Sequence, residues 1–135
     1  MTKIYARAYL PSDPMPMNLI PLIKGGTRAE VRTFTTPEGI VIAYGGIIID
    51  DNARAAETWL FPLYGFYKYP MAAFAVREDL RGLERYYMLP RYQMQTFTEK
   101  DARFAEWLGY EYEGTMRKSY QGKDARMYAR VTEWQ

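Results

Sequence analysis

The residues that could do chemistry in this chain are limited first by what is missing, because its 135 residues include no cysteine and no histidine. Thiolate nucleophiles, Ser-His-Asp triads and the usual zinc sites are therefore excluded, and we predict no metal site. Acid–base work would fall to carboxylates, tyrosines, lysines or a positioned water. The unusual feature of the composition is its aromatic content, with 13 tyrosines and 3 tryptophans. Such side chains line cores, ligand clefts or protein interfaces.

The densest aromatic cluster is the stretch Y-G-F-Y-K-Y-P at residues 64–70. Clustered tyrosines beside basic side chains have the composition of protein-interface hot spots. One interpretation is that the rings fill an opening in the fold, and the other is that they face a protein partner. For the second interpretation we predict a partner-binding patch made of Tyr64, Phe66, Tyr67, Tyr69 and Arg91.

The charge balance narrows the choice of partner. The formal net charge is +2 with both signs interspersed, which is too small to indicate nucleic-acid binding. Basic and aromatic residues do alternate near the C-terminus, at Arg117, Lys118, Tyr120 and Lys123, so this partner stays a minor alternative. We find no apolar run of the roughly 18 residues that a membrane helix needs. We also find no signal peptide, and therefore expect neither a membrane protein nor secretion by that route.

The elements that must position these residues follow from hydrophobic periodicity and turn signals. Strands are predicted at residues 3–9, 30–35, 40–49, 57–63 and 92–97, and a closing hairpin at 110–119 and 125–131 around a turn at 121–124. Helices are predicted at 71–86 and 98–108. Gly45 and Gly46, inside an apolar strand, indicate a bulge or a close backbone approach. We predict one α+β domain over residues 1–135, with a mixed, mostly antiparallel sheet of six or seven strands and flanking helices.

Residues 101–114, D-A-R-F-A-E-W-L-G-Y-E-Y-E-G, run from a helix through a glycine into a strand. This segment resembles the last helix and sixth strand of the GCN5-related N-acetyltransferase (GNAT) fold, which commonly shows A-x-x-F-Y-x-x-L-G-F-x-x-x-G here. The chain departs from that pattern at Ala105, where many members carry tyrosine. The order of the predicted elements agrees with the same fold, although the N-terminal helical region is shortened.

The resemblance implies an acetyl-CoA site directly after the strand at residues 57–63, where the family has an R/Q-x-x-G-x-G/A turn. Glycines there let backbone amides meet the pyrophosphate at a helix N-terminus. This chain instead has one glycine and three rings, so under this interpretation the cofactor-binding residues are Leu63, Tyr64, Gly65, Phe66, Tyr67 and Lys68. Ala105 cannot protonate a departing thiolate. Glu57 lies on the strand that can supply a general base in the family, although isolated glutamates are more often surface residues.

The shortened N-terminal half and the altered loop resemble GNAT-like proteins of tailed phages, including internal virion proteins of short-tailed phages. The main hypothesis from the sequence is therefore a non-catalytic phage protein without a cofactor. It would act through protein contacts, in the virion or the host bacterial cytoplasm, and a homo-oligomer is left open. The first alternative is an active acetyl-CoA-dependent N-acetyltransferase with an atypical CoA loop. The second is a phage protein that antagonises a host protein.

Overall fold

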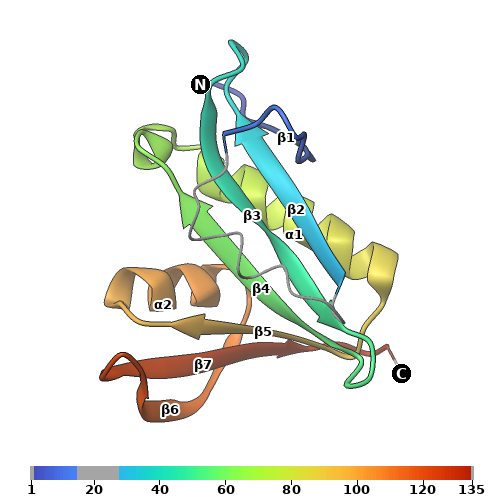
Figure 1. The fold of residues 1–135 in the computed structure, drawn as a ribbon, viewed down its shortest axis with the longest axis vertical. Coiled ribbons are helices and arrows are strands. Elements are labelled where there is room, and N and C mark those ends of the chain that lie inside the picture. The colour runs from blue at the N-terminus through green and yellow to red at the C-terminus, as the bar shows by residue number, and fades with distance from the viewer. Residues whose placement is uncertain (1, 15–27, 135) are drawn as a thin grey trace.

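A mixed, mostly antiparallel sheet with two α-helices makes up the computed structural model, which describes residues 2–14 and 28–134 (Figure 1). Its elements are β1 (Tyr5–Ala8), β2 (Arg28–Thr35), β3 (Val41–Asp50), β4 (Ala55–Pro62), the 3-10 helix η2 (Phe66–Lys68), α1 (Ala72–Tyr87), β5 (Arg91–Thr96), α2 (Glu99–Trp107), β6 (Glu111–Tyr120) and β7 (Lys123–Val131). The predicted α+β class and strand content are confirmed. The predicted shortening of the N-terminal helical region falls mainly on residues 15–27, outside the described residues.

The strand order β1-β2-β3-β4-β5-β7-β6 places the apolar strand β3 inside the sheet, as its composition predicts. The pair β4–β5 is parallel, and it is short: Ala55, Ala56 and Glu57 pair with residues 91–93 of β5. Beyond Glu57, β4 stays with β3 and β5 stays with β7. The two strands therefore diverge in the middle of the sheet, as Figure 1 shows for the green and orange arrows.

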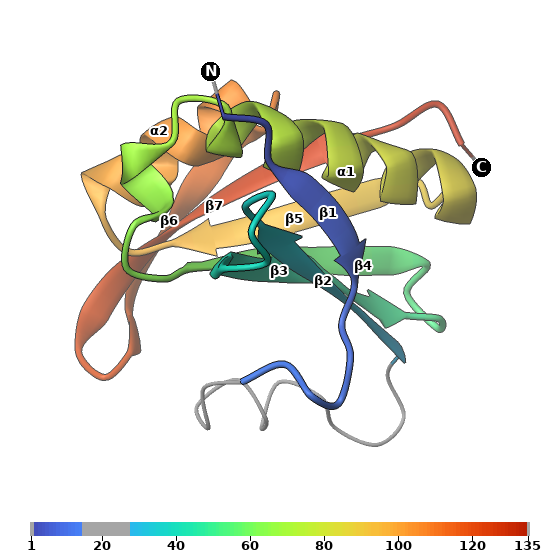
Figure 2. The ribbon, with the colours of Figure 1, turned by 90° about the horizontal axis from the view of Figure 1, so that it is seen from above.

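Both helices lie on the same side of the sheet (Figure 2). Helix α1 buries Ala72, Val76 and Leu80, one residue per turn, against the sheet. Thr98 caps helix α2, because its hydroxyl accepts a hydrogen bond from the Asp101 amide at 3.1 Å. No side chain caps the first turn of α1, although backbone carbonyls accept hydrogen bonds from the amides of Ala72 and Ala75.

Two glycine-containing segments, the strand around Gly46 and the closing hairpin, have geometries that the sequence predicts in part. At Gly46, φ is +145° and an added Cβ would lie 1.8 Å from the Glu30 carbonyl oxygen, so the predicted close approach of strands is confirmed. The closing hairpin differs from its prediction. Tyr120 pairs with Lys123, so the turn is Gln121-Gly122 and not a four-residue loop. Both turn residues have positive φ, 50° and 76°, which is the geometry that twisted two-residue hairpins adopt.

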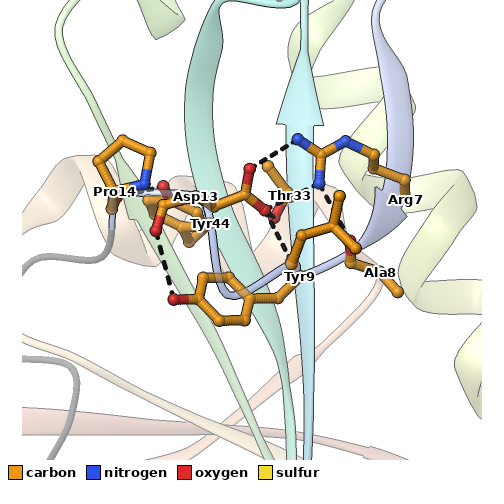
Figure 3. A network of polar contacts seen from close by, with 8 residues as sticks. Arg7, Ala8, Tyr9, Asp13, Pro14, Thr33 and Tyr44 are labelled. Carbon is orange, nitrogen blue, oxygen red and sulfur yellow. Dashed lines mark hydrogen bonds and ion pairs between the residues drawn. The ribbon is translucent and has the colours of Figure 1, made fainter.

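A network of polar contacts around Asp13 joins the N-terminal segment to the face of the sheet away from the helices (Figure 3). The buried carboxylate accepts two hydrogen bonds from Arg7, at 2.7 and 2.8 Å, one from the Leu10 amide at 2.8 Å and one from Thr33 at 3.1 Å. The Tyr44 hydroxyl donates a hydrogen bond to the carbonyl of Pro14, the residue that follows Asp13. These contacts fasten residues 7–14 across β2 and β3.

We expect Asp13→Asn to lower the free energy of unfolding by about 1–2 kcal/mol at neutral pH, the range for hydrogen bonds to a charged group with partial screening. Hydrogen bonding to Arg7 holds the pKa of Asp13 well below its usual range. The stabilisation is therefore complete above the unfolded-state pKa and is lost as the pH falls toward the folded-state value. Urea denaturation at neutral and acidic pH measures this.

Asp51→Asn is the matched control, because Asp51 makes the same two-pronged contact with Arg28 on an exposed surface. Its effect should be much smaller than that of Asp13→Asn. Equal effects of the two substitutions would show that burial of Asp13 contributes nothing.

Candidate active site

A cleft of about 910 Å³ opens where β4 and β5 diverge. This volume is within the usual range for small-molecule sites, roughly 300–1,000 Å³. Its walls come from both strands, the segment after β4, the start of α1, and α2. The residues that line it are Ile48, Glu57, Thr58, Trp59, Leu60, Pro62, Phe66, Tyr67, Ala73, Met94, Gln95, Phe97, Lys100, Asp101, Arg103, Phe104, Trp107 and Tyr120.

The aromatic loop does not fill this cleft, contrary to one of the sequence interpretations. Tyr64 is 90% exposed and projects away from the fold, with the Lys68 ammonium over its ring. Phe66 is 3% exposed and belongs to the hydrophobic core. Tyr67 lies along the wall, 59% exposed. Because Tyr64 lies outside the cleft and Phe66 and Tyr67 form part of its wall, the space that the rings were expected to occupy stays open.

The predicted partner-binding patch is not a continuous surface either. Phe66 is buried, and Tyr69 packs against the core. Arg91 is on β5, where its guanidinium binds Glu113 and Gln93. Sequence reasoning placed these residues together because they share a composition, whereas their positions in the fold separate them.

Two residues that line the cleft, one in η2 and one at the start of α1, have amides without a backbone partner in the described part of the chain. The loop satisfies its own amides at Phe66, Lys68 and Tyr69 through short turns. Those of Tyr67 and Ala73 donate to no backbone acceptor in the described part of the chain, and both residues line the cleft. Left-handed Gly65, with φ +96°, starts this turn and needs no second glycine. Amides are therefore available beside the cleft, in η2 and in the first turn of α1, without the family's glycine pattern.

The cations that line the cleft are Lys100 and Arg103, and not the Lys68 expected from the sequence. The Lys100 ammonium lies 3.3 Å from the centroid of the Tyr67 ring, on the opposite wall. Lys68 instead stacks on exposed Tyr64 and does not line the cleft. Lys100 belongs to α2, more than thirty residues further along the chain, and only the packing of α2 beside η2 brings it here. No local signal in the sequence indicates this.

Glu57 lies at the inner end of the cleft, at the last position where β4 pairs with β5. Burial raises the pKa of its carboxyl, while hydrogen bonds from the Gln93 side chain and the Gln95 amide, and the charge of Arg91, act in the opposite direction. The Gln93 amide nitrogen donates to the carboxylate at 3.0 Å. A half-buried carboxylate with a raised pKa at the base of a cleft has the properties of a general base.

Ala105 is fully buried and does not reach the cleft. The hydroxyls that do line it belong to Thr58, Tyr67 and Tyr120. Thr58 is held by Tyr110, with 2.7 Å between the two oxygens, and burial raises the pKa of Tyr110 far above its ordinary value. Tyr110 is therefore a neutral structural partner of Thr58 at any physiological pH.

Comparisons with known proteins identify the fold. No family model and no curated protein matches the chain. Among solved structures, the ribosomal-protein-S5-alanine acetyltransferase of Vibrio fischeri gives a TM-score of 0.69 at 17% identity, covering 79% of this chain and 64% of that one. A chimera of Vibrio cholerae spermidine N-acetyltransferase SpeG and hSSAT gives 0.74 at 12%, covering 95% of both.

RimL, a ribosomal L7/L12 alpha-N-protein acetyltransferase solved in complex with coenzyme A, gives 0.66 at 16%, covering 78% of this chain and 63% of that one. This chain thus spans less than two thirds of two of the three neighbours. It has the GNAT fold.

The expectation of a non-catalytic phage virion protein is wrong, because the neighbours are N-acetyltransferases and the cleft is open. Nothing in the comparisons supports a phage branch. Within the described residues, no helix is long and apolar enough to cross a membrane.

Proposed function

Starting from a chain with the fold of the GNAT acetyltransferases, we propose that this protein is an acetyl-CoA-dependent N-acetyltransferase. The observation that supports this most directly is the open cleft between β4 and β5, with Glu57 at its inner end. The cleft also reaches unused amides at Tyr67 and Ala73. A base and an anion-binding helix terminus at two ends of one cleft suit transfer from a carrier with a phosphorylated tail.

Under this proposal the residues divide by the face of the sheet from which they enter the cleft. Alternation along β4 places Thr58 toward the helices and Glu57 on the other face. Acetyl-CoA would be held on the helix side, by the amides of Tyr67 and Ala73 and the ammonium of Lys100. It supplies an acetyl thioester. The acceptor would approach Glu57 from the other face.

The role of Glu57 is to accept the proton that the acceptor amine loses as its nitrogen bonds to the acetyl carbon. The amine would thereby become an amide, and the sulfur of the broken thioester bond would leave as a thiolate that takes up a proton from solvent. Apolar surface around the carboxylate, from Ile48 and Trp59, disfavours its charge and raises its basicity. The enzyme is therefore most active with Glu57 ionised, and activity falls as the pH drops through the pKa of Glu57.

Calorimetric titration of the full chain with acetyl-CoA tests the proposal. We expect binding in the micromolar range, and release of free thiol when amines are added from a panel of peptide N-termini, lysine side chains and polyamines. Absence of heat at millimolar acetyl-CoA, in a sample shown to be folded by circular dichroism, would contradict the proposal. The sequence-based suggestion of a homo-oligomer stays a prediction.

Lys100→Ala should weaken acetyl-CoA binding about 10-fold, because a charge-assisted contact with a phosphate contributes on the order of 1.4 kcal/mol. The Kd from calorimetry measures this, and its difference from wild type should shrink as salt is added. Lys68→Ala is the matched control. Lys68 carries the same charge as Lys100 but lies in the aromatic loop, outside the cleft. The Kd of this variant for acetyl-CoA should therefore change less than about twofold. The reverse ranking would place the phosphates beside Lys68.

A further inference from the structure

A chain of hydrogen bonds runs along one face of the sheet from solvent to the cleft. Glu113 on β6 receives two hydrogen bonds from Arg91 on β5, at 2.6 and 3.1 Å. The Arg91 Nε donates to the Gln93 amide oxygen at 2.9 Å, and the Gln93 nitrogen donates to Glu57 Oε2 at 3.0 Å. The four side chains come from three strands that are distant in the sequence.

The chemistry of Arg91 fixes the direction of every bond in this chain. A guanidinium has donors and no acceptor, so the Gln93 amide must turn its oxygen toward Arg91. Its NH₂ group then faces Glu57 and donates to Oε2, a hydrogen bond that is stronger when the carboxyl is ionised and therefore favours the ionised form. Glu113 occupies the other edge of the guanidinium and holds it in this orientation.

We propose that Gln93 is a positioning residue, oriented by Arg91 and Glu113, that holds the Glu57 carboxylate in its proton-accepting form at the inner end of the cleft. The inference rests on the proposed function for the role of Glu57. An ordinary surface ion pair would account for Arg91 with Glu113, whose side chains are 32% and 39% exposed. It would not account for the third donor of Arg91 or for the bond to a carboxylate that lines the cleft.

The surroundings of Glu57 leave few other groups to set its protonation. Its partner on β3 is Ile48, which is apolar. On β5, Arg91 acts by charge and the Gln95 amide by a hydrogen bond, both favouring the ionised form. Glu113 of β6 touches Arg91 rather than Glu57. Lys100, Asp101 and Arg103 of α2 line the same cleft, two cations and one anion. Loss of the Gln93 side chain should therefore shift the pH at which Glu57 is half protonated.

The test measures the pKa of Glu57 by carbon-detected NMR of the side-chain carboxyl in the full chain, without any substrate. Gln93→Leu should raise the midpoint by about 1 pH unit, as loss of a hydrogen bond to a charged group would. Gln93→Glu, which supplies no donor when ionised, should raise it at least as far, and serves if the leucine variant does not fold. Gln95→Leu keeps its backbone amide and should leave the midpoint within about 0.3 unit.

Two substitutions of Arg91 distinguish the effect of its charge on Glu57 from its role in orienting Gln93. Arg91→Lys keeps the charge but cannot bind Gln93 and Glu113 together, so it should raise the midpoint less than Arg91→Met. In the transfer assay, the acidic limb of kcat against pH should move with the NMR midpoint in each variant. An unchanged midpoint in both Gln93 variants would overturn the positioning role whether or not acetyl transfer occurs. A shifted midpoint in a protein that transfers no acetyl group would confirm the positioning of Glu57 and reject only the proposed function.

Discussion

Replacement of Glu57 by glutamine is expected to lower kcat by about 10²–10⁴-fold, the usual contribution of a general base. Glutamine keeps the size of the side chain at the base of the cleft but cannot accept the proton of the acceptor amine. The Kd for acetyl-CoA should stay within about twofold of wild type, because the groups proposed to hold the carrier lie at the other end of the cleft. Single-turnover thiol release and calorimetry measure the two quantities separately.

The pH dependence of this variant is equally informative. Burial raises the pKa of Glu57, so wild-type activity should fall at a higher pH than for an exposed glutamate. In Glu57→Gln the residual rate should lose this acidic limb. Glu111→Gln, at the exposed start of β6, is the control and should leave kcat unchanged. If Glu57→Gln retained wild-type kcat, another group would have to be the base.

The largest expected effect on stability is that of Gly46→Ala, which we expect to lower the free energy of unfolding by about 3–5 kcal/mol. The new Cβ would lie 1.8 Å from the Glu30 carbonyl oxygen, and a φ of +145° is unfavourable for any residue with a side chain. The obstacle is backbone, so β2 and β3 would have to separate. For a domain with a total stability of about 5–15 kcal/mol this is a large fraction, measurable by urea denaturation.

Two other glycines separate the causes. Gly39, with φ +86°, has nothing within 4 Å of an added Cβ, so Gly39→Ala reports backbone strain alone and should cost about 1–2 kcal/mol. Gly82, inside α1, meets a single guanidinium nitrogen at 3.9 Å, so Gly82→Ala should be neutral or stabilising by up to about 1 kcal/mol. A Gly46→Ala variant as stable as Gly39→Ala would mean that the strands approach less closely than the structure shows.

Several features of the fold follow from the sequence alone because they depend on neighbours along the chain. The Thr98 cap is a contact between residues three apart, and the glycine that ends α2 needs only a positive φ, here 91°. The spacing of Ala72, Val76 and Leu80 gives the buried face of α1 from a periodicity of 3.6. The apolar composition of β3 likewise indicates a strand inside the sheet. Such signals predict the helices, the strands and the α+β class.

The arrangement of the candidate site depends on directions and distances that are not local. A loop with three rings suggests a filled opening, but only tertiary packing buries Phe66, turns Tyr64 outward and leaves the cleft open. Lys100 reaches that cleft, and Gln93 reaches Glu57, because strands and helices far apart in sequence are adjacent in space. The composition shows which functional side chains are present in the chain. Which of them share a cavity depends on the long-range contacts that bury its surface.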